Sequence, residues 1–502
     1  MQIHTPDWVK HAVFYQIFPD RFAKSKQPRE AKISHKESHI SHSVPLEPWD
    51  ATPTIQGYKG GDLWGVIEEL DYLQELGINA IYFTPIFQSA CNHRYHTHDY
   101  FQVDPLLGGN GALMELLEEC HQRDMKVVLD GVFNHASRGF FFFNDILENG
   151  PYSPWLDWFT IEDWPLSAYD GSKPANYLGW AGNRALPVFN HENSLVREYI
   201  MEIAEYWIKL GIDGWRLDVP FEIKVPGFWQ EFRERVKAIN PEAYIVGEIW
   251  EDAKQWLDGS QFDGVMNYLF TAPTIAFSAG DRVVREYVQQ QSYEPYPALD
   301  AAGYAAKIEH LLQLYPWEIQ LTQLNLLASH DTARLLSIAS GGNISPLEES
   351  LDSVKLATLL LLTFPGAPSI YYGDEVGLAG AVDPDSRRGF PTEIQWNRDV
   401  LEYHKQLISL RHAHPALRVG SYKILLSEGM VYVFARQLED EELIIAVNGG
   451  TEKTKVSFET SGLVSKPNKI LFGSSQIDWI TESEASYLSL EIPPRTSCIL
   501  GI

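Results

Sequence analysis

The chain has 502 residues, of which 45% are hydrophobic, and its 40 Lys and Arg against 67 Asp and Glu give a formal net charge of -27. This length and apolar fraction are typical of a globular protein with a large core and exclude a disordered chain. Because so negative a charge repels phosphate groups, and the Lys and Arg residues are scattered, we expect no nucleic-acid partner and no membrane surface as a partner.

Apolar segments alternate with amphipathic helical patterns along most of the chain, which is typical of βα units on a parallel sheet. The expected strands span residues 13–18, 78–83, 126–133, 214–218, 244–249, 262–267, 324–328 and 369–372. Eight such strands predict a protein of the α/β class with a (β/α)8 TIM barrel. After the third strand, apolar residues recur at helical spacing from Val196 to Ile208, and Gly211 is expected to end that helix.

Two segments interrupt this alternation. Residues 135–190 are crowded with aromatic residues, Gly and Pro, and we expect an inserted subdomain after strand three that lines a cleft. Its residues 140–143, Trp155, Trp158, Trp164 and Trp180 are expected to form a cleft wall. Alternating apolar runs near the C-terminus predict an antiparallel β domain. The expected domains are a barrel over residues 1–134 and 191–412, the insertion over 135–190, and a C-terminal β-sandwich over 413–502.

The cysteines and the chain ends bear on the cellular setting. Cys91, Cys120 and Cys498 are an odd number far apart in the sequence, which does not suit a disulfide framework. The N-terminus lacks the pattern of a signal peptide, and the longest strongly apolar run, residues 356–364, is too short to cross a bilayer. We therefore expect a cytoplasmic protein.

Polar residues cluster where the expected strands end. Ligands of a parallel barrel bind at the carboxyl ends of its strands, so these residues are candidates for the functional site: Asp130, His135, Arg216, Asp218, Glu248, His330 and Asp331. A single Asp at a strand end is often a helix cap or a structural ion pair. Four carboxylates, an arginine and two histidines at one mouth favour a catalytic site instead.

The acidic cluster predicts a division of roles between two carboxyl groups. Mutual repulsion should raise the pKa of at least one of them, while Arg216, two residues before Asp218 on the same strand face, should keep Asp218 anionic. A protonated and an ionised carboxyl group that flank one bond are what glycoside cleavage requires. The 15 Trp and 24 Tyr residues offer rings for packing against sugars, although most of them are expected in the core.

Four sequence blocks resemble, in order, the conserved regions of the α-amylase family, glycoside hydrolase family 13. They are residues 130–135 (DGVFNH), 214–218 (GWRLD), 247–250 (GEIW) and 328–331 (ASHD). Residues 186–190 (LPVFN), 15–22 (YQIFPDRF) and 370–375 (IYYGDE) resemble its branch of neopullulanases, cyclomaltodextrinases and maltogenic amylases. The resemblance covers nearly the whole chain.

The resemblance implies a role for each matched residue. Asp218 would be the nucleophile, Glu248 the acid/base, and Asp331 the carboxylate that grips and distorts the sugar at the cleavage point. His135, Arg216 and His330 would surround that sugar, and Tyr95 would stack on it. Asp383 and Arg387 would hold sugars further from the cleaved bond.

Three departures from the branch carry further expectations. The first barrel strand begins so early that we expect no N-terminal β domain, and any homo-oligomer would differ from the dimer built by that domain. After Asp218 the branch typically reads Val-Ala-Asn-Glu, whereas this chain has Val-Pro-Phe221-Glu222. Phe221 and Glu222 are expected to contact the acceptor sugar, with the ring of Phe221 in place of an amide. The segment of residues 23–29 (AKSKQPR) offers cations where calcium needs oxygen ligands, so no calcium site is expected there, and no metal or other cofactor is predicted.

We thus predict a retaining hydrolase of α-1,4-glucosidic bonds in short maltooligosaccharides, cyclodextrins or pullulan, with α-1,6 debranching and transglycosylation as side activities. Two alternatives stay open. His93, His96 and His98 could hold zinc in a barrel metallohydrolase, although loop histidines that line a polar cleft are the simpler interpretation. The chain could also be an amylase-like binding protein without catalysis, but such relatives usually lack one of the three carboxylates, and all three are present here.

Overall fold

The computed structural model describes residues 3–26, 44–289, 297–342, 348–460, 463, 469–482 and 485–501. Its centre is an eight-stranded parallel sheet in the order β8-β7-β6-β5-β2-β1-β10-β9. The strands are β1 (Phe14–Ile17), β2 (Ala80–Phe83), β5 (Lys126–Gly131), β6 (Gly214–Leu217), β7 (Tyr244–Gly247), β8 (Gly264–Val265), β9 (Leu324–Leu326) and β10 (Ala367–Tyr371). A parallel bridge between Met266 and Leu324 joins the two ends of this sheet, so the strands form a barrel. The expected fold class is confirmed, and each expected strand overlaps an observed one.

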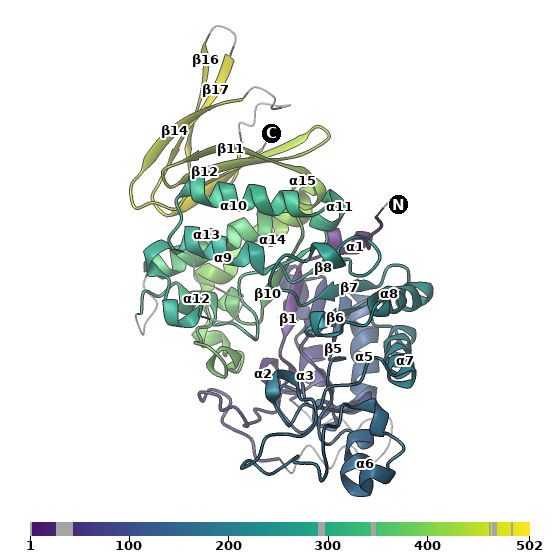
Figure 1. The fold of residues 1–502 in the computed structure, drawn as a ribbon. Helices are drawn as coiled ribbons and strands as arrows, with labels where there is room; N and C mark the ends of the chain where they lie inside the picture. Colours follow the sequence, from purple (N-terminus) through teal and green to yellow (C-terminus); the bar gives the residue numbers. More distant parts are fainter. Residues whose placement is uncertain are drawn as a thin grey trace.

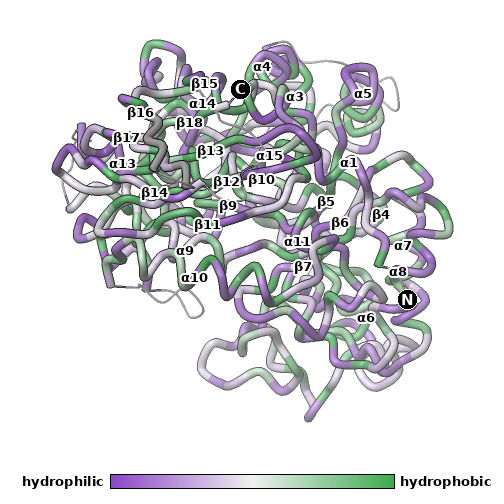
Figure 2. Tube along the Cα trace, turned by 90° about the horizontal axis from the view of Figure 1, so that it is seen from above, coloured by the Kyte–Doolittle hydropathy of each residue, from purple (hydrophilic) through white to green (hydrophobic). Residues whose placement is uncertain are grey.

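Helices surround the barrel, because its strands are buried along their whole length and need cover on the outside. They are α3 (Leu63–Glu68), α4 (Leu70–Leu76), α5 (Gly109–Gln122), α7 (Ser194–Leu210), α8 (Phe228–Ile239), α9 (Tyr268–Ser278), α10 (Ala301–Leu314), α13 (Glu348–Thr363) and α14 (Arg398–Ala413). Hydrophilic and hydrophobic segments alternate along outer helices such as α4 and α5 (Figure 2). Each therefore presents an apolar side to the barrel and a polar side to water.

Helix α7 ends where its sequence predicts, at Gly211. The Asn193 side chain accepts a hydrogen bond from the Leu195 N–H at the start, and Gly211 ends the helix with a φ of 112°. Only glycine adopts that left-handed conformation without steric cost, so the chain turns there into β6. Shorter helical segments of the barrel and its connection to the C-terminal sheets are α1 (Asp7–Lys10), α2 (Pro19–Phe22), α11 (Trp317–Gln320), α12 (Leu335–Ile338) and α15 (Pro415–Val419).

Two connections at the carboxyl ends of the strands contribute to the surroundings of the site. Between β2 and β5, strands β3 (Phe87–Ser89) and β4 (Thr97–Val103) form an antiparallel hairpin that the sequence did not predict. Between β5 and α7, the chain forms α6 (Phe141–Asn149) and short antiparallel bridges, among them His135 with Val188 and Phe159 with Phe189.

The C-terminal region consists of two antiparallel sheets. One has the order β11 (Ser421–Glu428), β12 (Val431–Leu438), β13 (Glu441–Asn448), β18 (Thr496–Gly501), β15 (Lys469–Gly473), and the other β14 (Thr454–Glu459), β17 (Ala485–Ile492), β16 (Gln476–Glu482). Side chains from both sheets share a core, including Val433, Ala446, Phe458 and Leu490. Figure 1 shows these sheets against α10 and α13, at the end of the molecule opposite α6. None of the helices in the described ranges is both long and apolar enough to cross a membrane.

Candidate active site

A cavity of about 750 Å³ opens at the carboxyl ends of the barrel strands. Eight of the residues that the sequence indicated as catalytic or substrate-binding line it. The lining consists of His93, Tyr95, His96, His135, Trp180, Asn183, Leu186, Asp218, Val219, Phe221, Glu248, Trp250, Gln289, Asp331, Asp383 and Arg387. Its walls thus combine carboxyl groups with aromatic rings, which is the mixture that a sugar-binding cleft requires.

Arg216 lies beneath the cavity and contacts three carboxyl groups. Its Nη1 donates to both carboxyl oxygens of Asp130 at 3.0 Å and to Asp218 Oδ1 at 3.2 Å. Its Nη2 lies 3.0 Å from Glu248 Oε2. Neighbouring strands β5, β6 and β7 supply these four residues, so the parallel register itself brings them together. Because Arg216 is fully buried, it positions and stabilises the carboxyl groups from below.

Backbone strain helps to hold Glu248 in place. Val219 has a φ of 35°, a left-handed conformation that is costly for a β-branched residue. In that conformation its N–H donates to Glu248 Oε2 at 3.1 Å, while Trp250 Nε1 donates to Glu248 Oε1 at 3.2 Å. Both oxygens of this carboxyl group are therefore fixed by groups outside the carboxylate cluster.

The pKa values of the cluster are raised, which differs in part from the expectation for Asp218. Burial and then repulsion from Glu248 raise the pKa of Asp218 well above its usual range, and Arg216 offsets this only in part. Burial also raises the pKa of Glu248, and it raises the pKa of Asp130 to about 6. One guanidinium divided among three carboxyl groups therefore offsets the effect of burial on their pKa values only in part.

A second hydrogen-bonded chain runs along the floor of the cavity. The Tyr95 hydroxyl donates to Asp130 Oδ2 at 2.9 Å and lies 2.5 Å from His330 Nε2. Gln16 Nε2 lies 2.8 Å from His330 Nδ1, so both ring nitrogens are engaged. The Tyr95 and His330 rings stack with an interplanar angle of 9°. His330 thus holds the Tyr95 ring in position and is itself buried away from the cavity.

His135 lines the cavity beside Trp180. Its ring stacks on Trp180 at 5.2 Å, and Asn134 Nδ2 lies 3.2 Å from its Nδ1. Its Nε2 is buried and, within the described part of the chain, makes no hydrogen bond of regular geometry. Burial lowers the pKa of His135 to about 3, so the ring is neutral and can hydrogen-bond to a hydroxyl group.

The opposite rim carries Asp331, Asp383 and Arg387. Arg387 Nη1 lies 3.1 Å from Asp383 Oδ1, and its Nη2 lies 3.5 Å from Asp331 Oδ1. His330 Nε2 lies 3.1 Å from Asp331 Oδ2. The three rim residues form a connected group of charged side chains next to the Asp218 and Glu248 pair.

The structure places the candidates in three groups. Asp218, Glu248, Asp331, Tyr95, His135, Phe221, Asp383 and Arg387 line the cavity. Arg216 and His330 lie behind it and contact its carboxyl groups and Tyr95. The Glu222 side chain is exposed and lies outside the lining, because the 3-10 turn η5 (Pro220–Glu222) directs it elsewhere.

Only part of the expected aromatic wall faces the cavity. Trp180 lines it, but Phe142, Trp155 and Trp158 pack on one another, with the Phe142 and Trp155 rings 3.8 Å apart. The expectation that all of these rings form a wall is wrong, because the insertion needs a core of its own. Lining residues that no sequence pattern indicated include Asn183 and Gln289, whereas Leu186 and Trp250 lie in the blocks 186–190 and 247–250 but were not named as site residues.

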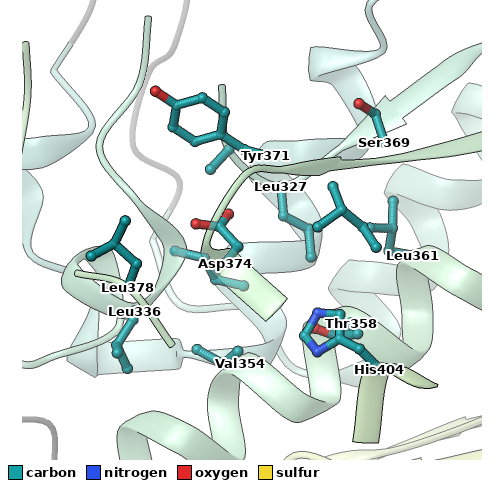
Figure 3. A pocket seen from close by; sticks show the side chains of 13 residues that line it. Leu327, Leu336, Val354, Thr358, Leu361, Ser369, Tyr371, Asp374, Leu378 and His404 are labelled. Carbon is teal, nitrogen blue, oxygen red and sulfur yellow. The ribbon is translucent and has the colours of Figure 1, made fainter. Parts of the chain in front are cut away.

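A second pocket lies beside the barrel, between α12, α13 and β10. Figure 3 shows Leu327, Leu336, Val354 and Leu361 with the Asp374 and His404 side chains around it. It offers about 20 Å³, the space of about one water molecule, so it cannot hold a sugar.

The candidate metal ligands also differ from the expected set. In the described residues, the group that could hold a metal ion is Cys91, His93 and His96, and His98 does not belong to it. The segment 23–29, where no calcium is expected, lies partly outside the described residues.

Comparisons with known proteins bear on this site. Residues 16–398 match the family model described as the α-amylase catalytic domain, and residues 420–500 match that of the α-amylase C-terminal domain. The chain is 41% identical to "Neopullulanase 2" of Thermoactinomyces vulgaris, over 99% of this chain and 78% of that protein. It is also 41% identical to "Cyclomaltodextrinase" of a Bacillus species, over 92% of this chain and 76% of that protein.

Two solved structures are similar to this chain over nearly its whole length. The "Debranching Enzyme" of Nostoc punctiforme, in its native form, superposes with a TM-score of 0.92 at 67% identity and covers 100% of both chains. The "Cyclic alpha-maltosyl-(1-->6)-maltose hydrolase" of Arthrobacter globiformis superposes with a TM-score of 0.83 at 34% identity, over 99% of this chain and 100% of the other.

Proposed function

Because this chain belongs to the α-amylase family of glycoside hydrolases, we propose that it cleaves α-glucosidic bonds with retention of configuration. Its substrates are short maltooligosaccharides, cyclodextrins or pullulan, with α-1,4 cleavage, α-1,6 debranching and transglycosylation. The observation that carries this proposal is the pair of Asp218 and Glu248 on neighbouring strands, which share Arg216 at the base of a cavity with aromatic walls.

The proposed reaction has two steps that use these side chains. Asp218 attacks the anomeric carbon while Glu248 gives its proton to the departing oxygen, which leaves a covalent glycosyl-enzyme. Glu248, now ionised, takes a proton from water, and the resulting attack on the anomeric carbon releases the sugar and frees Asp218. A sugar hydroxyl in place of water gives transglycosylation.

The surrounding residues would bind the reacting sugar. His135 and Asp331 both line the cavity, where their side chains would hydrogen-bond to sugar hydroxyl groups. The Tyr95 ring, fixed by Asp130 and His330, offers a flat apolar face. These groups would favour a distorted sugar ring through contacts that strengthen in the transition state.

Cleavage of α-1,6 bonds has specific support as a main activity. The Nostoc punctiforme structure at 67% identity is named for debranching, and the Arthrobacter globiformis hydrolase is named for a substrate with (1-->6) links. Phe221 is 37% exposed and lines the cavity together with Asp218 and Val219, on the acceptor side. It places an aromatic ring where the resembling branch has an amide. We propose that this ring packs against the acceptor sugar of a branch point.

The first test follows the anomer that is released. We expect proton nuclear magnetic resonance to show the α-anomer first when maltohexaose is hydrolysed, because two displacements preserve configuration. Initial appearance of the β-anomer would show a single displacement and contradict the roles of Asp218 and Glu248. Product analysis on maltohexaose, pullulan, β-cyclodextrin and a branched oligosaccharide would then give the balance of α-1,4 and α-1,6 cleavage.

The second test replaces the nucleophile. Asp218→Asn should lower kcat by at least about 10⁴-fold with an unchanged fold, because an amide cannot form the ester intermediate. Near wild-type turnover by this variant, with circular dichroism showing the same fold, would disprove the assignment.

A further inference from the structure

The connection between β3 and β4 brings three metal-binding side chains to the edge of the cavity. Cys91, His93 and His96 have ligand atoms within 4.8 Å of one another. The Cys91 Sγ lies 3.5 Å from His93 Nδ1, and the His93 and His96 ring centroids are 5.2 Å apart in an edge-on arrangement. Bond lengths of roughly 2.0–2.3 Å place neighbouring donors of a tetrahedral zinc ion about 3.3–3.6 Å apart. The first pair already has this spacing, and a small side-chain movement would bring in the third ligand.

The contacts that a cation would replace are weak. The Tyr95 N–H donates to His93 Nδ1 at 3.2 Å, and the Cys91 Sγ lies 3.3 Å from Ser89 Oγ. The nearby positive charge of Arg387 is balanced, because Arg387 pairs with both Asp383 and Asp331. A neutral imidazole and a thiolate are ligands that borderline and soft divalent cations prefer to alkaline-earth ions.

We propose that Cys91, His93 and His96 form an inhibitory site for a thiophilic divalent cation of the Zn²⁺ class. On binding, the Cys91 S–H gives up its proton to solvent, and the thiolate and two imidazole nitrogens take three of four tetrahedral positions. His93 and His96, which flank Tyr95 in the sequence, both line the cavity. The fourth ligand position of the cation therefore faces the substrate cleft. The bound cation obstructs the place where a glucan chain would lie.

Binding can be measured independently of catalysis. Protein freed of metal with a chelator is titrated with Co²⁺, whose thiolate complex has a charge-transfer band in the near ultraviolet. Wild-type protein should show this band and saturate at one equivalent, and Cys91→Ser should lack the band. His98→Gln is the matched control, because His98 is a nearby histidine outside the ligand group, and it should behave as wild type. Absence of the band in wild type, or an equal band in Cys91→Ser, would overturn the proposal.

Inhibition links the site to the cleft and rests on the proposed hydrolase function for its readout. Zn²⁺ should raise the KM for maltohexaose while kcat stays unchanged, and a chelator should restore the initial value. Cys91→Ser, whose side chain lies outside the cavity lining, should keep the metal-free rate and need at least about tenfold more Zn²⁺ for half inhibition. Equal Zn²⁺ inhibition of wild type and Cys91→Ser would place the inhibitory ion elsewhere and disprove the proposal. If the enzyme did not hydrolyse maltohexaose at all, the Co²⁺ titration would still decide whether the metal site exists.

Discussion

Arg216 determines the electrostatics of the cavity at the level of single residues. Its guanidinium contacts Asp130, Asp218 and Glu248, and all four residues are buried. Burial raises the pKa of each carboxyl group, and the single positive charge of Arg216 opposes that rise. A carboxyl group with a raised pKa is suited to donate a proton to a departing oxygen.

The first residue-scale prediction concerns Glu248→Gln. A glutamine cannot donate the proton, so kcat on maltohexaose should fall about 10²–10⁴-fold, whereas α-glucosyl fluoride, whose leaving group needs little protonation, should lose far less. Since Glu248 acts in its protonated form, wild-type kcat/KM should decline as pH rises through the raised pKa of Glu248, and the variant should lack this alkaline decline.

Steady-state rates on both substrates from pH 4 to pH 9 check this prediction. Glu251→Gln is the matched control, since Glu251 is an exposed glutamate in the same segment and its replacement should leave the rate and its pH dependence unchanged. A similar loss on both substrates would argue against Glu248 as the proton donor.

At the scale of secondary-structure elements, the insertion between β5 and α7 supplies one side of the cavity through Trp180. Its indole lies against His135 at an interplanar angle of 21°. Trp180→Ala should lower kcat/KM on maltohexaose about tenfold, mainly through KM, because His135 loses its stacking partner and the sugar loses an apolar surface.

Initial-rate measurements with the matched variant Trp164→Ala test this role. Trp164 belongs to the same insertion and lies outside the cavity lining, so its replacement should leave KM nearly unchanged. Equal changes in KM for the two variants would mean that the insertion acts only through its overall folding.

A second element-scale prediction concerns the attachment of the C-terminal sheets. Arg436 of β12 is fully buried and donates to backbone carbonyl groups of Leu417 at 2.8 Å and Gly420 at 2.9 Å, and to Thr363 at the end of α13. Burial lowers the pKa of Arg436 to about 9, so keeping this cation inside the protein costs free energy. The carbonyl groups at the end of α13 offset part of this cost, because they favour a positive charge. Arg436→Leu leaves several buried acceptors without donors and should lower the free energy of unfolding by about 3 kcal/mol.

Urea unfolding at neutral pH measures this loss. Arg398→Leu, which removes an exposed arginine paired with Glu393, should change stability by less than about 0.5 kcal/mol. If Arg436→Leu were as stable as wild type, the carbonyl contacts would not hold the C-terminal sheets to the barrel.

At the scale of the whole molecule, the cavity limits the size of the substrate. Its volume of about 750 Å³ lies within the range of pockets that enclose small ligands, so it accommodates only a few glucosyl units at a time. The insertion at Trp180 and Asn183 and the rim at Asp383 and Arg387 bound it on two sides. A long helical or branched polymer must unwind or bend to enter, at a cost that a short chain does not have.

We therefore expect a higher kcat/KM per molecule on maltooligosaccharides of about six to eight units than on starch or amylopectin. Initial rates at matched molar concentrations of chains, measured by the release of reducing ends, check this expectation. Equal or faster attack on starch would show that the cleft is open to polymers.

The sequence by itself determined the α/β class, the eight strands and helix α7, because hydrophobic periodicity and a helix-ending glycine act over a few residues. It also identified the carboxylates at the strand ends, since the carboxyl ends of parallel strands meet at one mouth. The resemblance of residues 130–135, 214–218, 247–250 and 328–331 to known motifs added the family, which the comparisons confirm.

Only the tertiary structure decided which charged contacts those residues make and how they are arranged around the cavity. Burial and then repulsion from Glu248 raise the pKa of Asp218, and Arg216, which also contacts Asp130 and Glu248, opposes this rise only in part; these contacts depend on distances across three strands. Local backbone direction turns Glu222 away from the cavity. The loop after β3 brings Cys91 to His93 and His96, while His98 is left out. Burial and contacts between residues far apart set pKa values and ligand geometry, and neither is visible in a linear pattern.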